Sequence, residues 1–232
     1  MNIETLTDSE ALANRSCQFI EEAARYSIAD HESFVWAVSG GSTPKRFLEK
    51  LAYSEEIDWS KVHLFQVDER IAPDGDPLRN ATMIEQALFS TADLSAKDLA
   101  GYYLMPVTKP DLETSANQYA EKINEITNTK ASFDLIQLGL GDDGHTASLI
   151  PGDPILKVED KDVGLTGEYR GSCRMTLTKP ILNKAKALLW VVSGESKADA
   201  YKKFVNKNLS IPASMLDQNI STVLIDESAS ND

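Results

Sequence analysis

Short apolar segments alternate with helix-period segments along this chain, and this alternation restricts its fold more than any other feature. The segments with strand character are 34–38, 62–67, 133–138, 188–192 and 222–225, with a weaker candidate at 102–105. Between them, apolar residues recur at helical spacing over the segments 9–27, 44–51, 78–89, 112–126 and 197–207. Strands that alternate with helices predict an α/β fold of Rossmann-like type, with a mainly parallel sheet and helices on both faces.

Two of the predicted helices have a specific start signal. Asp8 precedes the first as a candidate N-cap, and Thr43 precedes Pro44, which is typical of an N-cap followed by the first helical position. Residues 152–172 are rich in glycine and polar residues and are predicted to form a loop. Because no repeat or linker divides the chain, residues 1–232 are predicted to form a single domain.

Composition excludes several classes of partner. The net charge of −13 argues against nucleic acid and against an anionic membrane surface, and an anionic substrate would need a local cationic pocket. The first residues lack a basic segment followed by an apolar core, and no apolar run approaches the roughly 20 residues of a membrane span. Cys17 and Cys173 have no metal-ligand spacing and suggest no disulfide framework. We therefore expect a cytoplasmic protein.

The segment 39–44, Ser-Gly-Gly-Ser-Thr-Pro, lies between a predicted strand and a predicted helix. Its glycines, Gly40 and Gly41, allow the backbone to approach a ligand, and the helix N-terminus offers free N–H groups and a positive dipole end. Phosphate fits such a loop, with the hydroxyls of Ser42 and Thr43 as further donors. The segment is not a Walker A loop, because no Gly-Lys-Ser/Thr closes it. A turn that uses glycine for geometry alone is the alternative.

Charged residues also lie at the ends of apolar segments. Asp68-Glu69-Arg70 directly follows 62–67, so Asp68 could face a cleft and Arg70 could bind an oxyanion or offset the charge of Asp68. Arg174 and Lys197 border later apolar segments. Each alone is interpretable as a solvated or paired charge, but together with a phosphate loop they would supply the cationic pocket.

Residues 139–144, Gly-Leu-Gly-Asp-Asp-Gly, formally match the dinucleotide-binding pattern G-x-G-x-x-G. The match is misleading, because that pattern requires a following helix, and two carboxylates would repel a pyrophosphate. His145 follows this turn and is a candidate for proton transfer, since imidazole ordinarily titrates near neutrality. Asp143 is its candidate orienting partner, and an exposed loop histidine is the alternative. One histidine with scattered carboxylates gives no convincing ligand set, so no metal is expected.

In their order along the chain, these motifs resemble those of the 6-phosphogluconolactonase family. The stretches that carry the resemblance are 39–44, 68–70, 139–149, 174–178, 194–198 and 212–214, with Asp226 near the end. The related glucosamine-6-phosphate deaminases have Asp-Glu-Tyr where this chain has Asp68-Glu69-Arg70, and a glutamate where it has Ile150. One departure is Leu78-Arg79-Asn80, where the lactonases commonly have Asp-Ser-Asn. Asn80 therefore matches the family pattern, and the role of Arg79 stays open.

The resemblance implies an α/β fold like that of the deaminases, with helices on both faces of the sheet. It also implies hydrolysis of 6-phospho-D-glucono-1,5-lactone to 6-phospho-D-gluconate in the oxidative pentose phosphate pathway. It implies no cofactor. His145 would be the general base that activates water, oriented by either Asp143 or Asp68, with Arg70 nearby. The implied phosphate-binding residues are Gly40, Gly41, Ser42, Thr43, Arg174 and Lys197.

Two alternatives differ in function from this interpretation. One is a glucosamine-6-phosphate deaminase or isomerase, against which Ile150 argues. The other is a non-catalytic sugar-phosphate sensor, which would need a DNA-binding segment that the predicted elements leave no room for. We expect the partner to be a small sugar-phosphate lactone and the protein to be a monomer or a weak homo-oligomer.

Overall fold

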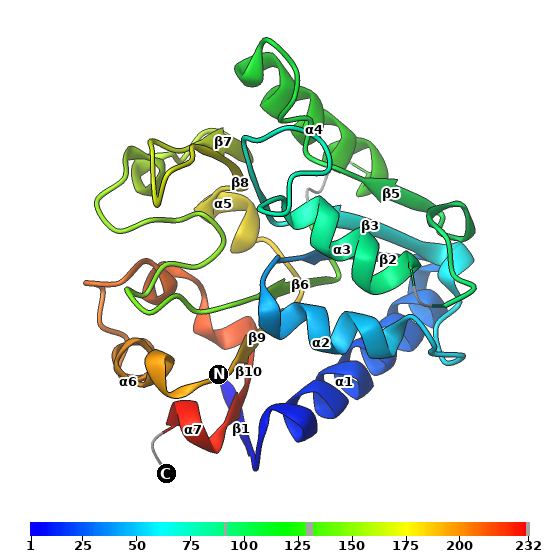
Figure 1. The fold of residues 1–232 in the computed structure, drawn as a ribbon, viewed down its shortest axis with the longest axis horizontal. Coiled ribbons are helices and arrows are strands. Elements are labelled where there is room, and N and C mark those ends of the chain that lie inside the picture. Colours follow the sequence, from blue (N-terminus) through cyan, green and yellow to red (C-terminus); the bar gives the residue numbers. More distant parts are fainter. Residues whose placement is uncertain (91, 129–131, 231–232) are drawn as a thin grey trace.

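The computed structural model describes residues 1–90, 92–128 and 132–230, and a seven-stranded parallel sheet forms its centre (Figure 1). The strand order is β1-β10-β9-β6-β2-β3-β5. The strands are β1 Asn2–Leu6, β2 Phe34–Val38, β3 Val62–Gln66, β5 Gly101–Tyr103, β6 Leu135–Leu138, β9 Leu188–Val192 and β10 Ser221–Asp226. The predicted parallel sheet is confirmed, although no strand was expected over residues 2–6.

Helices cover both faces of this sheet, as predicted. The α-helices are α1 Ser9–His31, α2 Ser42–Leu51, α3 Asn80–Phe89, α4 Leu112–Ile126, α5 Lys179–Leu182, α6 Ala198–Val205 and α7 Glu227–Ser230. Short 3₁₀ helices cover Trp59–Lys61, Ala96–Asp98, Pro154–Lys157, Glu195–Lys197, Pro212–Met215 and Gln218–Ile220. One apolar cluster joins α1, α2 and α3 to one face, and a second joins α4 and α6 to the other.

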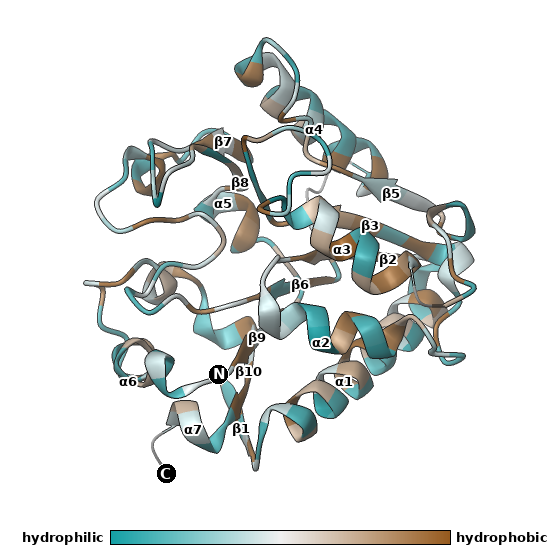
Figure 2. Cartoon of the chain, viewed as in Figure 1, coloured by the Kyte–Doolittle hydropathy of each residue, from teal (hydrophilic) through white to brown (hydrophobic). Residues whose placement is uncertain are grey.

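The strands are apolar at nearly every position because both of their faces are buried. In β2, Phe34, Trp36 and Val38 belong to the cluster with α1, whereas Val35 and Ala37 belong to the cluster with α4. Side chains alternate between the two faces of a strand, so a strand covered on both faces has to be apolar throughout. Figure 2 shows the result as brown central strands beneath helices whose outer faces are teal.

A second, antiparallel sheet packs beside the first and was not predicted. Its order is β4-β8-β7, with β4 at Asp68–Arg70, β8 at Arg174–Leu177 and β7 at Val163–Leu165. The prediction that 152–172 is entirely loop was therefore wrong, and Asp68–Arg70 is a strand instead of the end of one. These strands are three or four residues long, and β4 pairs with a segment about 100 positions away, so their own sequence holds no signal of the pairing.

The start of α2 also differs from its prediction. The helix begins at Ser42 with Gly41 as N-cap, at φ 118°, so Thr43 is not the N-cap and Pro44 is the third helical residue. Proline is tolerated there because the first-turn N–H groups have no intrahelical acceptor. At α1 the prediction was correct: the Asp8 carboxylate accepts hydrogen bonds from the first-turn N–H groups.

The order of the strands fixes where a ligand site can form. β2 and β6 are neighbours, but the next strand after β2 lies on one side and the next main-sheet strand after β6 on the other. Such a reversal leaves a crevice at the carboxyl ends of the two strands, where open α/β sheets bind ligands. Among the described residues, no helix combines the length and apolarity needed to cross a membrane.

Candidate active site

A cleft of about 230 Å³ opens at the carboxyl ends of β2 and β6. Its lining comprises residues 39–44, Asp68, Arg70, Asn80, residues 139–141, residues 145–147, Arg174, residues 191–193 and Lys197. The structure thus brings together every residue that the sequence analysis singled out for the site, except Asp143, which lies beside His145. The charged side chains of the lining are Arg70, Arg174, Lys197 and Asp68, so the cleft is locally cationic in a chain with a net charge of −13.

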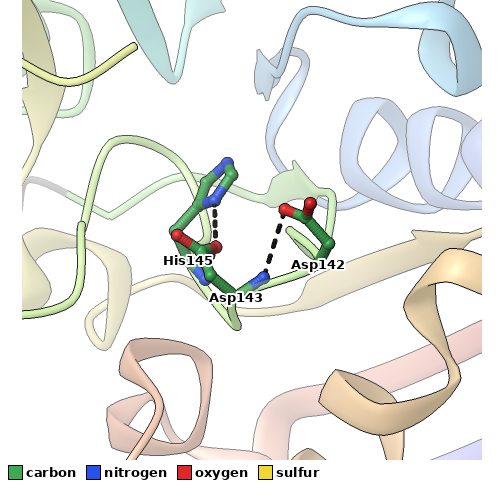
Figure 3. Close-up of side chains that lie close together, drawn as sticks. All are labelled: Asp142, Asp143 and His145. Carbon is green, nitrogen blue, oxygen red and sulfur yellow. Dashed lines mark hydrogen bonds and ion pairs between the residues drawn. The ribbon is translucent and has the colours of Figure 1, made fainter.

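The Asp143 carboxylate holds the imidazole of His145. Oδ1 of Asp143 lies 2.6 Å from Nδ1 of His145 and 3.1 Å from its backbone N (Figure 3). The other ring nitrogen, Nε2, points away from this carboxylate (Figure 3). Of the two candidates for orienting the imidazole, it is Asp143 and not Asp68 that contacts the ring.

The ionisation of Asp143 decides which ring nitrogen carries the proton. Burial opposes its ionisation, but hydrogen bonds from Tyr169 and from His145 outweigh burial and lower the pKa of Asp143 to about 2. At neutral pH the carboxylate is therefore charged and can only accept hydrogen bonds. Nδ1 of His145 must donate, so Nε2 of the neutral imidazole is left with the free electron pair.

Two glycines make room for functional side chains. A Cβ atom on Gly141 would lie 2.1 Å from Nδ1 of His145, so this position lets the imidazole fold back over its own turn. A Cβ atom on Gly40 would lie 1.9 Å from Oδ1 of Asn80. Gly141 thus makes room for His145 and does not serve the dinucleotide pattern that it formally matches, and Gly40 makes room for Asn80.

Asp68 belongs to a separate buried network. Its Oδ2 accepts from the Ser148 hydroxyl at 2.6 Å, and its Oδ1 accepts from the Asn80 amide at 3.2 Å. Asn80 in turn accepts from Nη1 of Arg70 at 2.8 Å. Only the return of the chain through β4 and α3 brings these side chains together.

The middle residue of Asp68-Glu69-Arg70 has a structural role. The fully buried Glu69 carboxylate accepts from the backbone N of Asn80 at 2.7 Å and of Ala81 at 2.9 Å, which satisfies the first N–H groups of α3. It also forms an ion pair with Arg79 at 2.9 Å. Arg79, whose role the sequence left open, therefore neutralises a buried carboxylate away from the cleft lining.

The glycine loop is tied to the neighbouring strand and leaves the start of α2 open. The Ser39 backbone N donates to the Gln137 side chain at 3.1 Å, and the Ser39 hydroxyl donates to the Gln137 carbonyl at 3.0 Å. No side chain caps the N-terminus of α2, and its first turn carries no acidic residue. The loop and this first turn therefore offer N–H groups and a positive dipole end to an anion.

Arg174 and Lys197 reach the cleft from different elements. Arg174 lies in β8 and is 6 % exposed, and within the described part of the chain its buried Nε has no hydrogen-bond partner. Burial lowers the pKa of Arg174, and the negative charge of Asp68 opposes that effect. Lys197 ends the 3₁₀ helix after β9, where the Asp226 carboxylate accepts from Ser193 and from the Gly194 backbone.

Asp142, Asp143 and His145 are the residues of the site with metal-ligand character. One ligand atom from each lies within 4.8 Å of the others (Figure 3). However, Asp142 forms an ion pair with Arg170 at 2.7 Å, and both oxygens of Asp143 accept from Tyr169 or His145. These contacts fit an orienting role for the carboxylates.

Tyr169 is the main contact that sequence reasoning missed. Its hydroxyl donates to Oδ2 of Asp143 at 2.7 Å, and its ring meets the His145 imidazole edge to face, with centroids 5.5 Å apart. It lies in the segment that was predicted to be only loop. The neighbouring Gly171, which takes a positive φ in the turn, is the local signal that could have placed it.

Comparison with known proteins gives a consistent family. A 6-phosphogluconolactonase of Synechocystis sp. is 34% identical over 202 residues, which is 85% of this chain and 82% of that protein. The crystal structure of 6-phosphogluconolactonase from Thermotoga maritima matches with a TM-score of 0.83 at 26% identity, covering 97% of this chain and 98% of that one. A monomeric glucosamine-6-phosphate deaminase matches with a TM-score of 0.82 at 19% identity, covering 100% and 99%, and so shares the fold.

The family model agrees with these matches and with the motifs. The model described as glucosamine-6-phosphate isomerases/6-phosphogluconolactonase matches residues 7–225. That span contains the glycine loop, the turn that ends in His145, and the small sheet that carries Arg174. The chain belongs to the glucosamine-6-phosphate isomerase/6-phosphogluconolactonase family.

Proposed function

We propose that this protein hydrolyses 6-phospho-D-glucono-1,5-lactone to 6-phospho-D-gluconate, the reaction of a carboxylic ester hydrolase in the oxidative pentose phosphate pathway. One observation carries the proposal: an imidazole with a free Nε2 and an uncapped, glycine-rich helix start line the same cleft. Hydrolysis of a phosphorylated lactone needs both features: a general base that activates water, and a binding site for the phosphate. The 6-phosphogluconolactonases among the relatives support the same reaction.

In the proposed mechanism, His145 is the general base. Nε2 takes a proton from water as the water oxygen bonds to C1 of the lactone, which gives a tetrahedral intermediate. The C1–O bond to the ring oxygen then breaks, and the imidazolium returns the proton to that oxygen. The Asp143 carboxylate stabilises the imidazolium through Nδ1, and a positioned base of this kind contributes about 10²–10⁴-fold to the rate.

The substrate phosphate would bind in the same cleft. Gly40, Gly41, Ser42 and Thr43 supply backbone N–H groups and hydroxyls at the start of α2, and the side chains of Arg174 and Lys197 add positive charge. These local donors act within a few ångströms, whereas salt screens the diffuse negative charge of the chain beyond about 8 Å. Arg70, fixed by Asn80, would stabilise the negative charge that develops on the lactone carbonyl oxygen.

The residue at position 150 favours lactone hydrolysis over deamination. Ile150 is 5 % exposed and packs where the related deaminases are expected to carry a glutamate for ring opening. An apolar side chain cannot transfer a proton, so the chain lacks that group at this position. Because a glucosamine-6-phosphate deaminase has the same fold, the site residues have to distinguish lactone hydrolysis from deamination.

A direct assay tests the proposed function. Freshly prepared 6-phosphogluconolactone is added to the protein, and the 6-phosphogluconate formed is measured against the spontaneous opening of the lactone. A parallel reaction contains glucosamine 6-phosphate and measures released ammonia. We expect acceleration of lactone opening and no ammonia. Equal rates with and without protein would refute the lactonase, and ammonia release would favour the deaminase.

The organisation of the protein is part of the proposal. We propose that residues 1–232 act as one domain, without a cofactor, as a monomer or weak homo-oligomer in the cytoplasm. The cleft lining draws on the loops that follow β2 and β6 and on β4, β8 and β9, which supports one functional unit. Sedimentation at several protein concentrations tests the oligomeric state.

A further inference from the structure

The tip of the β7–β8 hairpin contacts the turn that carries His145. Arg170 and Gly171 occupy the two turn positions with φ of 50° and 85°, and Tyr169 and Ser172 exchange backbone hydrogen bonds across them. Positive φ at both central positions is the geometry of a type I′ turn, which gives a short and rigid hairpin end. The hairpin therefore holds Tyr169 at a fixed place.

Tyr169 contacts the proposed general base, His145, and its carboxylate partner, Asp143, without lining the cleft. Its hydroxyl donates to Oδ2 of Asp143 at 2.7 Å, while Oδ1 of the same carboxylate holds His145 at 2.6 Å. Tyr169 is not part of the cleft lining. It can therefore affect the reaction through the side chains that it contacts, among them Asp143, His145 and Arg174.

Fixing both carboxylate oxygens restricts the rotation of the Asp143 side chain. The terminal torsion of aspartate is broad, so a carboxylate held at one oxygen can turn about its axis. With Tyr169 on one oxygen and His145 on the other, the carboxylate plane is set, and with it the direction of the imidazole. The ring of Tyr169 adds an edge contact to the imidazole.

The same ring also packs against Arg174, one of the proposed phosphate-binding residues. The guanidinium carbon of Arg174 lies 5.0 Å from the centroid of the Tyr169 ring. Arg174 is almost fully buried, and a cation over an aromatic face gains most where water is excluded. Tyr169 thus contacts Asp143, the partner of the proposed base, through its hydroxyl, and Arg174 through its ring.

We propose that Tyr169 is a positioning residue that sets the Asp143–His145 pair through its hydroxyl and Arg174 through its ring face. The proposal rests on the proposed lactonase function for its catalytic part. The two contacts use different parts of one side chain, so a substitution can remove the hydroxyl while keeping the ring.

Tyr169→Phe and Tyr169→Leu separate these two contacts kinetically. Tyr169→Phe should lower kcat about tenfold, the effect of one lost hydrogen bond to a charged group, with KM within about twofold of wild type. Tyr169→Leu should lower kcat similarly and also raise KM, because Arg174 loses the ring. Tyr26→Phe, at an exposed tyrosine of α1, is the matched control and should change neither constant.

A carboxyl ¹³C NMR titration tests the contact independently of the substrate. In Tyr169→Phe, the Asp143 carboxyl should titrate at higher pH than in wild type, and in Tyr26→Phe it should not move. An unchanged Asp143 titration would overturn the proposal even if the protein acted on another substrate. A shifted titration with wild-type kcat would overturn the positioning role. Failure of lactone hydrolysis in wild type would instead refute the proposed function and leave the titration to decide the contact.

Discussion

The hydroxyl of Ser148 donates to Oδ2 of Asp68 at 2.6 Å, although 80 positions separate the two residues in the chain. Both side chains are buried, and the serine lies three residues after His145. A serine held by a carboxylate in this way is a donor within a network. The imidazole instead has Asp143 on its Nδ1.

Ser148→Ala tests whether this hydroxyl acts as a nucleophile. Because it donates to Asp68, we expect its removal to lower kcat by less than about tenfold, the cost of one hydrogen bond to a charged group. Loss of a true nucleophile costs on the order of 10⁴-fold or more. The kcat on the lactone measures this difference, and an acyl-serine adduct seen by mass spectrometry would contradict the water mechanism.

His145→Ala should remove the general base and leave the phosphate site in place. We expect kcat to fall about 10²–10⁴-fold, with KM changed little. Steady-state kinetics on fresh lactone measures both constants. His63→Ala is a matched control, because His63 stacks on Tyr103 away from the cleft lining. Near-normal turnover in His145→Ala would refute the assignment of the base.

Arg174→Ala and Lys197→Ala should weaken the binding of the substrate phosphate. Loss of one charge-assisted contact corresponds to a rise in KM of about tenfold or more, with a smaller change in kcat. Inhibition by inorganic phosphate should weaken in parallel. Lys202→Ala, at an exposed lysine of α6, is the control. A fall in kcat at unchanged KM would argue against a phosphate-binding role.

Gly40→Ala should destabilise the protein or displace Asn80. The added Cβ would lie 1.9 Å from Oδ1 of Asn80, and overpacking of this kind costs about 1–3 kcal/mol. The melting temperature should fall by several degrees, at about 2–4 °C per kcal/mol for a chain of this size. At Gly139 a Cβ would meet no atom within 4 Å, so Gly139→Ala should melt close to wild type. Equal melting of the two variants would contradict the argument.

The two cysteines should differ in reactivity. Burial, assisted by the negative charge of Glu21, raises the pKa of Cys17 to about 12, so its thiol stays protonated below that pH while the protein is folded. Cys173 is exposed. With a disulfide reagent at pH 8 we expect one thiol to react in the native protein and two after unfolding, and only one in native Cys17→Ser. Rapid reaction of two thiols in the native protein would contradict this.

Local sequence patterns were sufficient to locate a helix or strand wherever that element is long or is buried on both faces. The helix predicted over 112–126 and the strand predicted over 188–192 are α4 and β9 within the same bounds. At α1, the predicted helix ends four residues before His31, because the last turn carries little apolar periodicity. The edge strand β1 escaped prediction, since most of its side chains are exposed and its one neighbour, β10, lies at the other end of the chain.

For the site, the sequence by itself determined which chemical groups are present and at which strand ends. Turn chemistry and a helix start are local properties, so the glycine loop and the turn before His145 could be located from a few neighbouring residues. The tertiary structure decided the partners: Asp143 and not Asp68 for the imidazole, Ser148 for Asp68, and Tyr169 for Asp143. The Ser148–Asp68 and Tyr169–Asp143 contacts join residues 80 and 26 positions apart, and they form only when the small sheet packs beside the large one. Such packing depends on the burial of both sheets together, which no single segment of the chain encodes.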